Sequence, residues 1–167
     1  MGVHHYKVAL LPKAFFGHQV PATLSEADVE RGEDVASGWW ASYPPSARLV
    51  SAIRTLLPND ESWGETEEYL SAGDWGSDVR IWKDGGRVWS IQFRFAPVAD
   101  GWQLMERFIA VARDEHCVLL EEGSLSILEP DDNIVRERLS ASQAMQFVRD
   151  PAGTIVQASK KLEEGSD

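Results

Sequence analysis

The fold is decided by the stretch Asp78-Val-Arg-Ile-Trp-Lys-Asp-Gly-Gly-Arg-Val-Trp-Ser-Ile-Gln-Phe-Arg-Phe95. Apolar and polar residues alternate on both sides of Asp84-Gly-Gly86, which predicts two antiparallel strands joined by a tight turn. A three-residue loop places Ile81 opposite Trp89 and gathers the apolar side chains on one face, whereas a two-residue loop at Asp84-Gly85 splits them between the faces. We therefore predict the three-residue loop, with one apolar and one mixed face.

Four further segments surround this hairpin. Residues 6–11 and 117–120 predict strands, because both are short apolar runs bounded by turn or helix signals. Residues 46–57 and 100–112 predict amphipathic helices, since their apolar residues recur at helical spacing behind possible caps at Ser46 and Asp100. The resulting order is β-α-β-β-α-β, the plan of ferredoxin-like folds. We predict an α+β, ferredoxin-like core with one antiparallel sheet and two helices on one of its faces.

The whole chain of 167 residues suits a single domain. We place the core at residues 5–120, a C-terminal strand and helical extension at 121–150, and a frayed tail at 151–167. The extension is long enough to cover the second sheet face at least partly. Residues 13–45 and 59–76 have little apolar periodicity and predict mainly irregular structure, with a short helix beginning near Ser25.

Composition indicates a compartment and excludes several classes of protein. The chain has one cysteine and therefore no internal disulfide, which fits a reducing environment. It begins without an apolar signal core and contains no apolar run approaching the ~20 residues that span a bilayer. We expect a cytoplasmic protein without a membrane segment. The formal net charge of −11 opposes binding to nucleic acid.

The negative charge is concentrated before the hairpin, in residues 58–78, and after the second helix, in residues 115–167, and the first of these stretches also contains tryptophan. Residues 58–78 contain seven Asp or Glu and no Lys or Arg. Acidic surfaces attract basic partners, and tryptophan is enriched at binding hot spots. This pattern predicts an interaction module of the immunity, inhibitor or adaptor type that acts on a basic protein. The expected partner-binding residues are Asp60, Glu61, Trp63, Glu65, Glu67, Glu68, Asp74 and Trp75. The alternative interpretation is that acidic loops keep the chain soluble and the tryptophans close those loops onto the core.

The mixed face of the hairpin provides a second hypothesis. Its arginines could hold an anionic ligand in a small-molecule or enzyme domain, because guanidinium groups bind carboxylate and phosphate oxygens in pairs. The candidate ligand-binding residues are Arg80, Trp82, Gln92 and Arg94. Reversing the acidic charges would weaken the first function, and Arg94→Ala would weaken the second.

No motif in the sequence names a reaction, a cofactor or a metal. Cys117 and His116 are neighbours in a predicted strand, so they point to opposite faces and cannot act as a nucleophile and its base. The four histidines lack the spacing of metal ligands. Asp84-Gly-Gly86 lacks the Lys and the Ser or Thr of a phosphate loop. We therefore predict no catalytic, metal or cofactor residues, and we favour a non-enzymatic protein.

Overall fold

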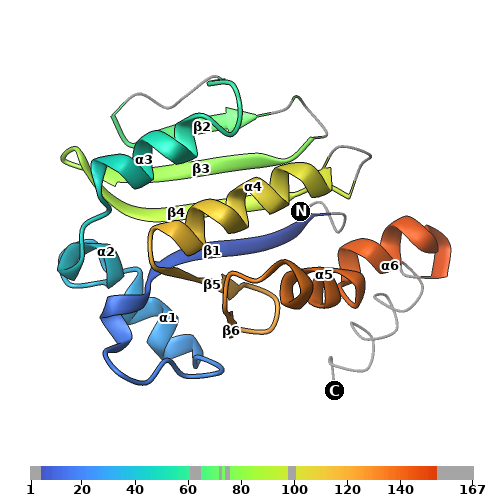
Figure 1. Ribbon diagram of the computed structural model, residues 1–167, viewed down its shortest axis with the longest axis horizontal. Coiled ribbons are helices and arrows are strands. Elements are labelled where there is room, and N and C mark those ends of the chain that lie inside the picture. The colour runs from blue at the N-terminus through green and yellow to red at the C-terminus, as the bar shows by residue number, and fades with distance from the viewer. Residues whose placement is uncertain (1–4, 61–64, 72, 74–75, 98–100, 154–167) are drawn as a thin grey trace, which may run out of the picture.

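The computed structural model describes residues 5–60, 65–71, 73, 76–97 and 101–153, and it combines a single antiparallel sheet with helices on both faces (Figure 1). In chain order the elements are β1 (Tyr6–Pro12), η1 (Lys13–Phe16), α1 (Glu26–Gly32), α2 (Trp39–Ser42), α3 (Ala47–Arg54), β2 (Glu67–Ser71), β3 (Asp78–Asp84), β4 (Arg87–Phe95), α4 (Gly101–Asp114), β5 (Cys117–Glu121), β6 (Ser126–Leu128), α5 (Asp132–Ser140) and α6 (Gln143–Arg149).

The sheet has six strands in the order β2-β3-β4-β1-β5-β6. The predicted α+β class is confirmed, but this is not the ferredoxin-like strand order, so that topology is not confirmed. One reason is β2, which lies in the acidic stretch that the sequence predicts to be a loop. Its residues pair in register with β3, from Glu67 opposite Trp82 to Ser71 opposite Asp78. The second addition is β6, which pairs with β5 at the other end of the sheet.

The β3–β4 hairpin has the predicted faces but a different register. Its loop is Gly85-Gly86, because Asp84 pairs with Arg87, and both glycines have positive φ (54° and 80°) as such a turn requires. A register shift between Trp82 and Lys83 then brings Ile81 opposite Ile91 rather than Trp89. The three-residue loop is therefore wrong. Val79, Ile81, Ile91, Phe93 and Phe95 still share one face, without Trp89, because the shift restores the side-chain alternation that the loop would have lost.

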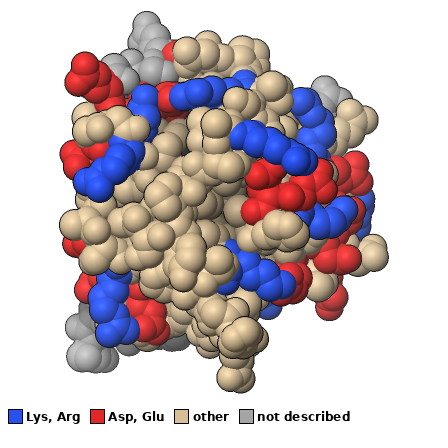
Figure 2. All heavy atoms as spheres, turned by 60° about the vertical axis from the view of Figure 1, so that its left-hand side comes forward, with Lys and Arg blue, Asp and Glu red and all other residues tan. Residues whose placement is uncertain are grey.

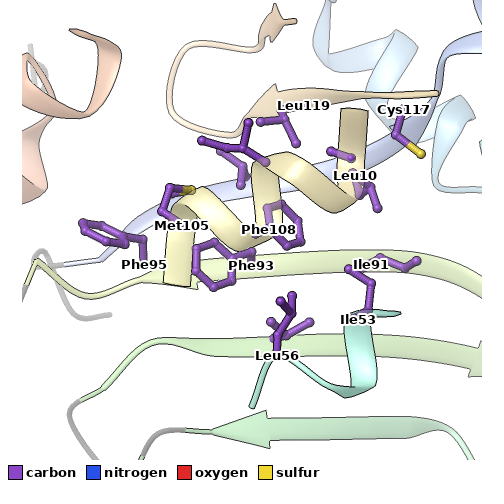
Figure 3. Close-up of a cluster of buried hydrophobic side chains, with 14 of the residues drawn as sticks. Leu10, Ile53, Leu56, Ile91, Phe93, Phe95, Met105, Phe108, Cys117 and Leu119 are labelled. Atoms are coloured by element: carbon purple, nitrogen blue, oxygen red, sulfur yellow. The ribbon is translucent and has the colours of Figure 1, made fainter. Parts of the chain in front are cut away.

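The main core lies between this sheet face and helices α3 and α4 (Figure 3). Ser46 caps α3 by accepting a hydrogen bond from the Leu49 amide at 2.9 Å, and Ile53 of that helix is fully buried. From α4, the Phe108 ring stacks on the Phe93 ring of β4 with centroids 4.8 Å apart. Both amphipathic helices thus occur where the sequence predicts them, although the proposed cap at Asp100 lies outside the described residues.

The C-terminal helices were expected to cover the second sheet face at least partly, but they do not lie on that face. Val135 and Leu139 of α5 and Ala144 of α6 belong to the main core, and Arg113 of α4 donates to the Pro130 carbonyl at 3.0 Å. The extension therefore extends the helical layer beside α4 (Figure 1). It packs there because its apolar residues are too few to form a layer of their own.

The second face is covered over β1, β5 and β6 by residues that precede α3. A smaller apolar cluster gathers there from the sheet, from η1 and α1, and from Trp39 of α2: Ala9, Leu11, Trp39, Val118 and Leu120, with Phe16, Val20, Leu24, Val29 and Ile127 around them. The short helix predicted near Ser25 is present as α1, with a complete capping box between Ser25 and Asp28. The prediction of irregular structure at Trp39 and Trp40 is wrong.

Helix α2 joins the two cores through adjacent tryptophans. Trp39 belongs to the smaller cluster and Trp40 to the main core, and each is only 3% exposed. The β1–β4 register ends at Ala9 opposite Gln92, and the next β1 carbonyl, that of Leu10, accepts a hydrogen bond from the Trp40 indole at 3.1 Å. The indole therefore takes the place of a strand partner where β1 and β4 separate.

Both outer edges of the sheet are paired with irregular segments. Beside β2, the Asp60 amide donates to the Tyr69 carbonyl at 2.8 Å and the Ser71 amide donates to Pro58 at 3.1 Å. Beside β6, Leu24 donates to Leu125 and Ile127 donates to Ala22, both at 2.8 Å.

Within the described ranges, no helix combines the length and the apolar content needed to cross a membrane.

Candidate functional site

The structure describes only half of the predicted acidic site. Glu61, Trp63, Asp74 and Trp75 lie outside the described residues, and Asp60 and Glu65 are exposed. Glu67 is only 5% exposed, and its carboxylate lies 3.6 Å from Arg80 of the neighbouring strand. It lies on the sheet face that also carries Arg80 and Trp82, opposite α3 and α4, because side chains alternate between the two faces along β2.

Glu68 points to the other side of β2 and is also neutralised within the chain. Arg54 of α3 donates to both of its carboxylate oxygens at 2.7 and 2.6 Å, and Lys83 of β3 lies 2.9 Å away. Hydrogen bonds from Arg54, together with Lys83, lower the pKa of Glu68 to about 2, although partial burial opposes this. The acidic stretch has no base within it, but other elements of the described chain pair four bases with its acids: Arg54, Arg80, Lys83 and Arg94.

The second hypothesis named Arg80, Trp82, Gln92 and Arg94, and the structure does bring these residues together on the sheet face opposite α3 and α4. Two acids accompany them. Arg94 donates from Nε to both oxygens of Asp78 at 2.8 and 2.9 Å, and the hydrogen bond to Asp78 is the main reason why the pKa of Arg94 is raised. Asp78 is 2% exposed.

Arg80 lies between acids on both sides. Its guanidinium is 3.6 Å from Asp78 and from Glu67, and it stacks over the Tyr69 ring with 5.1 Å to the centroid. The charges of both arginines are therefore already offset by carboxylates of β2 and β3. An added anion would have to displace or oppose these carboxylates, so the geometry does not favour the anionic-ligand hypothesis.

The clearest surface feature is a face without charge. Figure 2 shows the side of the molecule on which the β3–β4 turn, α2 and η1 lie, with an uncharged centre and Lys, Arg, Asp and Glu around it. We give the name aromatic face to two groups of aromatic side chains from these elements and the residues near them: Phe15, Phe16 and Tyr43, and Trp82 with Trp89. In a chain of which 26% of residues are charged, a charge-free face is distinctive.

Ring contacts organise this face. The Phe15 ring meets the rings of Phe16 and Tyr43 edge-on, with centroids 5.5 and 6.4 Å away. The ring centroids of Trp82 and Trp89 lie 6.1 Å apart. Phe15 and Tyr43 are 37% and 44% exposed, which makes them two of the four large exposed apolar side chains in the described part of the chain.

Sequence reasoning misassigned several of these residues. Trp89 was predicted to lie in the core, but the register shift beside it leaves it half-buried against Trp82. Trp102 of α4 is half-buried at the core edge beneath Arg136, whose guanidinium lies 3.9 Å from the ring centroid. Phe15 and Tyr43 were not predicted at all. The signal that could have found them is the dense aromatic content of an otherwise aperiodic segment, residues 15–43.

A second polar cluster, also missed, surrounds Glu121 at the end of β5. Its carboxylate is 7% exposed and accepts from the Tyr6 hydroxyl at 2.8 Å, from Ser124 and from Arg138 of α5. Burial alone would raise the pKa of Glu121, but these hydrogen bonds together lower it. Burial and the bond to Glu121 raise the pKa of Tyr6, so its hydroxyl is a neutral donor.

Two observations concern the residues that could support catalysis or bind a metal. Cys117 is 3% exposed, and burial, with the nearby Glu115, raises its pKa to about 12. Such a thiol is not a nucleophile at neutral pH. In the part of the chain that the structure describes, no three His, Cys, Asp or Glu side chains come together as a metal site.

Comparisons with protein-family models, with curated proteins and with solved structures find no match for this chain.

Proposed function

We propose that this protein is a non-enzymatic binding module, of the inhibitor or adaptor type, that holds a basic protein partner against its aromatic face. The observation that carries the proposal is the exposed pair of Phe15 and Tyr43, whose rings meet edge-on with their centroids 6.4 Å apart. Centres of protein interfaces are depleted of charge and enriched in aromatic residues, and exposed rings of this size are costly to leave in water.

The charge distribution supports a basic partner. The net charge of −11 creates a negative field that accelerates the approach of a positively charged protein. The exposed acids of the predicted site, Asp60 and Glu65, contribute to that field. Glu67 and Glu68 contribute less, because Arg80, Arg54 and Lys83 offset their charges. The acids thus steer association, while the aromatic face provides the contact area.

A cavity beside the face can receive an anchoring side chain. It has a volume of about 380 Å³, and its walls include Phe15, Phe16, Leu24 and Trp39. Hot-spot side chains of a partner commonly fill such apolar pockets near the centre of an interface. We assign this cavity to one aromatic or long aliphatic side chain of the partner.

Site-specific photo-crosslinking in native host cells tests the proposal. A benzophenone amino acid replaces Tyr43, or, as the control, Val148 of α6, which is 49% exposed on another element. We expect position 43 alone to give one crosslinked protein of basic composition. With that protein purified, Phe15→Ala and Tyr43→Ala should each weaken the equilibrium affinity at least ~10-fold, because hot-spot truncations cost ~2 kcal/mol or more.

Kinetics separate the two parts of the proposal. Asp60→Lys and Glu65→Lys should slow association at low salt and have little effect at high salt, whereas Tyr43→Ala should speed dissociation. Equal crosslinking from position 148, an acidic partner, or affinities unchanged by both aromatic variants would each refute the proposal.

A further inference from the structure

The cavity of about 380 Å³ beside the aromatic face has walls that packing and hydrogen bonds hold in place. Its buried wall is the Trp39 indole, which lies directly on Gly32, where an added Cβ atom would come within 2.0 Å of the ring. On another wall, the Leu24 amide donates to the Leu125 carbonyl at 2.8 Å. The cavity is therefore formed before a ligand enters. Its volume is near the lower end of the range of ~300–1,000 Å³ for small-molecule sites, which suits a single side chain.

Arg31 of α1 lies at the rim of this cavity. Asp28, Arg31 and Gly32 share one side of α1, because Arg31 and Gly32 follow Asp28 by three and four residues, and all three line the cavity. The Arg31 guanidinium donates to the Asp28 carboxylate, and the Arg31 side chain is 76% exposed. Hydrogen bonds from Ser25 and then Arg31 lower the pKa of Asp28 to about 2, so it is an anion at neutral pH. In the part of the chain that the structure describes, Arg31 bonds to no other acceptor and lies over no aromatic ring.

Elsewhere the same chain places arginines that are paired with carboxylates over aromatic rings. Arg136 lies 3.3 Å from the Glu106 carboxylate, and its guanidinium is 3.9 Å from the centre of the Trp102 ring. Arg80 lies between two acids and over the Tyr69 ring, at 5.1 Å from its centre. The pair at the cavity rim has the arginine and the acid of this arrangement, but not the ring.

The lining favours an aromatic side chain over an aliphatic one of similar size. The rings of Phe15, Phe16 and Trp39 line the cavity, and aromatic rings in edge-on or offset contact attract each other beyond the effect of buried area. A guanidinium above a ring adds a cation–π attraction that an aliphatic side chain lacks. A basic side chain would be repelled by Arg31. An acidic one would compete with Asp28, which already offsets the charge of Arg31.

We propose that this cavity selects an aromatic side chain of the partner and holds its ring against the Arg31 guanidinium. Asp28 positions the guanidinium, and the buried Trp39 ring closes the inner end of the cavity. The inference rests on the proposed function, because it names the class of residue by which the partner is anchored. It excludes the aliphatic anchor that the volume alone allows.

The test measures how the full chain, labelled with ¹⁵N, binds the N-acetyl amides of single amino acids at millimolar concentration. The matched pair of probes is phenylalanine and cyclohexylalanine, which are similar in shape and differ in the π electrons of the ring. The amides of tyrosine, tryptophan and leucine complete the set. We expect phenylalanine to bind at least ~2-fold more tightly than cyclohexylalanine. The aromatic probes should shift the amide signals of residues 15–16, 23–24, 28–32 and 39.

Two variants complete the experiment. Arg31→Gln removes the cation from an exposed ion pair that contributes little to stability, and it should lower the preference for phenylalanine over cyclohexylalanine ~2–5-fold. Arg136→Gln removes another exposed arginine, which stacks over Trp102 outside this cavity, and it should leave the preference unchanged.

Three results would each overturn the inference: no shifts with any probe, equal binding of the matched pair, or a preference that Arg31→Gln does not change. None of these results alters the crosslinking from position 43 or the effects of Phe15→Ala and Tyr43→Ala. Failure of the aromatic anchor is therefore distinguished from failure of the proposed function.

Discussion

The Trp40 indole provides a sharp test of how β1 and α2 are joined. Its N–H donates to the Leu10 carbonyl at 3.1 Å, at a position where the register of β1 with β4 has ended. Trp40→Phe keeps an aromatic ring but removes the donor, which leaves a buried carbonyl without its partner. A buried polar group that loses its partner costs ~1–3 kcal/mol.

Trp39→Phe is a matched control in the adjacent residue. Trp39 is equally buried, at 3%, and no described acceptor bonds its indole. Both substitutions remove the same ring atoms, so the difference between them isolates the hydrogen bond. We expect Trp40→Phe to lower the free energy of unfolding by ~1–3 kcal/mol more than Trp39→Phe. For a chain of this size, the corresponding gap in Tm is ~2–12 °C.

Urea denaturation followed by circular dichroism measures both variants, with the slope m checked for two-state behaviour. The indole N–H of Trp40 should be protected from exchange in the native protein. Equal losses for the two variants, or a larger loss for Trp39→Phe, would show that the Leu10 carbonyl is satisfied in another way and would refute the junction described here.

Three further predictions concern titratable groups. The pKa of Glu68 is depressed in the folded protein, so its pairs with Arg54 and Lys83 stabilise the fold above the ordinary glutamate pKa, and this stabilisation is lost as pH falls towards 2. Because Arg54 is half-exposed, Glu68→Gln should lower the free energy of unfolding by only ~0.5–1 kcal/mol at pH 7 and should not change it near pH 2, as measured by urea denaturation. Burial raises the pKa of Glu122 in the folded protein, so the ionised carboxylate destabilises the fold and stability falls as pH rises. Glu122→Gln should therefore raise Tm at pH 7. An increase in Tm that persisted well below the ordinary glutamate pKa would contradict this cause. With its pKa raised to about 12, Cys117 should resist alkylation at pH 8 until the chain is unfolded, and rapid labelling of the native protein would show that it is accessible.

The parts of the fold that could be predicted are those set by local periodicity. The helices α3 and α4 and the faces of the β3–β4 hairpin depend on which residues are apolar at spacings of two to four, and that information is in the sequence. The hairpin register was wrong because the shift at Lys83 depends on how Trp89 is accommodated, which adjacent residues do not show.

Strand β2 could not be predicted, because its stabilising partners are distant in sequence. Glu67 and Glu68 look like surface acids, yet they become strand residues once Arg80, Arg54 and Lys83 are placed around them. Charge patterns read along a chain show only the neighbours in sequence. The same limit hid the Glu121 cluster, which joins residues more than 100 positions apart.

The candidate surface was half predicted. An interaction role, a basic partner and a contribution from tryptophan remain predictions, and our proposal takes the aromatic face, in place of the acidic stretch, as the contact surface. Phe15 and Tyr43 were not predicted to be surface contact residues because they belong to neither a helical nor a strand pattern. They are brought together by η1 and α2, whose positions are set by the cores that Trp39 and Trp40 fill.

The pairing of both sheet edges affects how the chain associates with other chains at high concentration. Residues 58–60 and 22–24 occupy the positions on which a foreign strand would otherwise grow. Under the proposed function, a partner would therefore be recognised through side chains, whose chemistry can discriminate, and not through backbone pairing, which any extended peptide can offer. The same two segments block fibril growth at the sheet edges. Proteolytic removal of either one would expose an unpaired edge to which any extended peptide could bind.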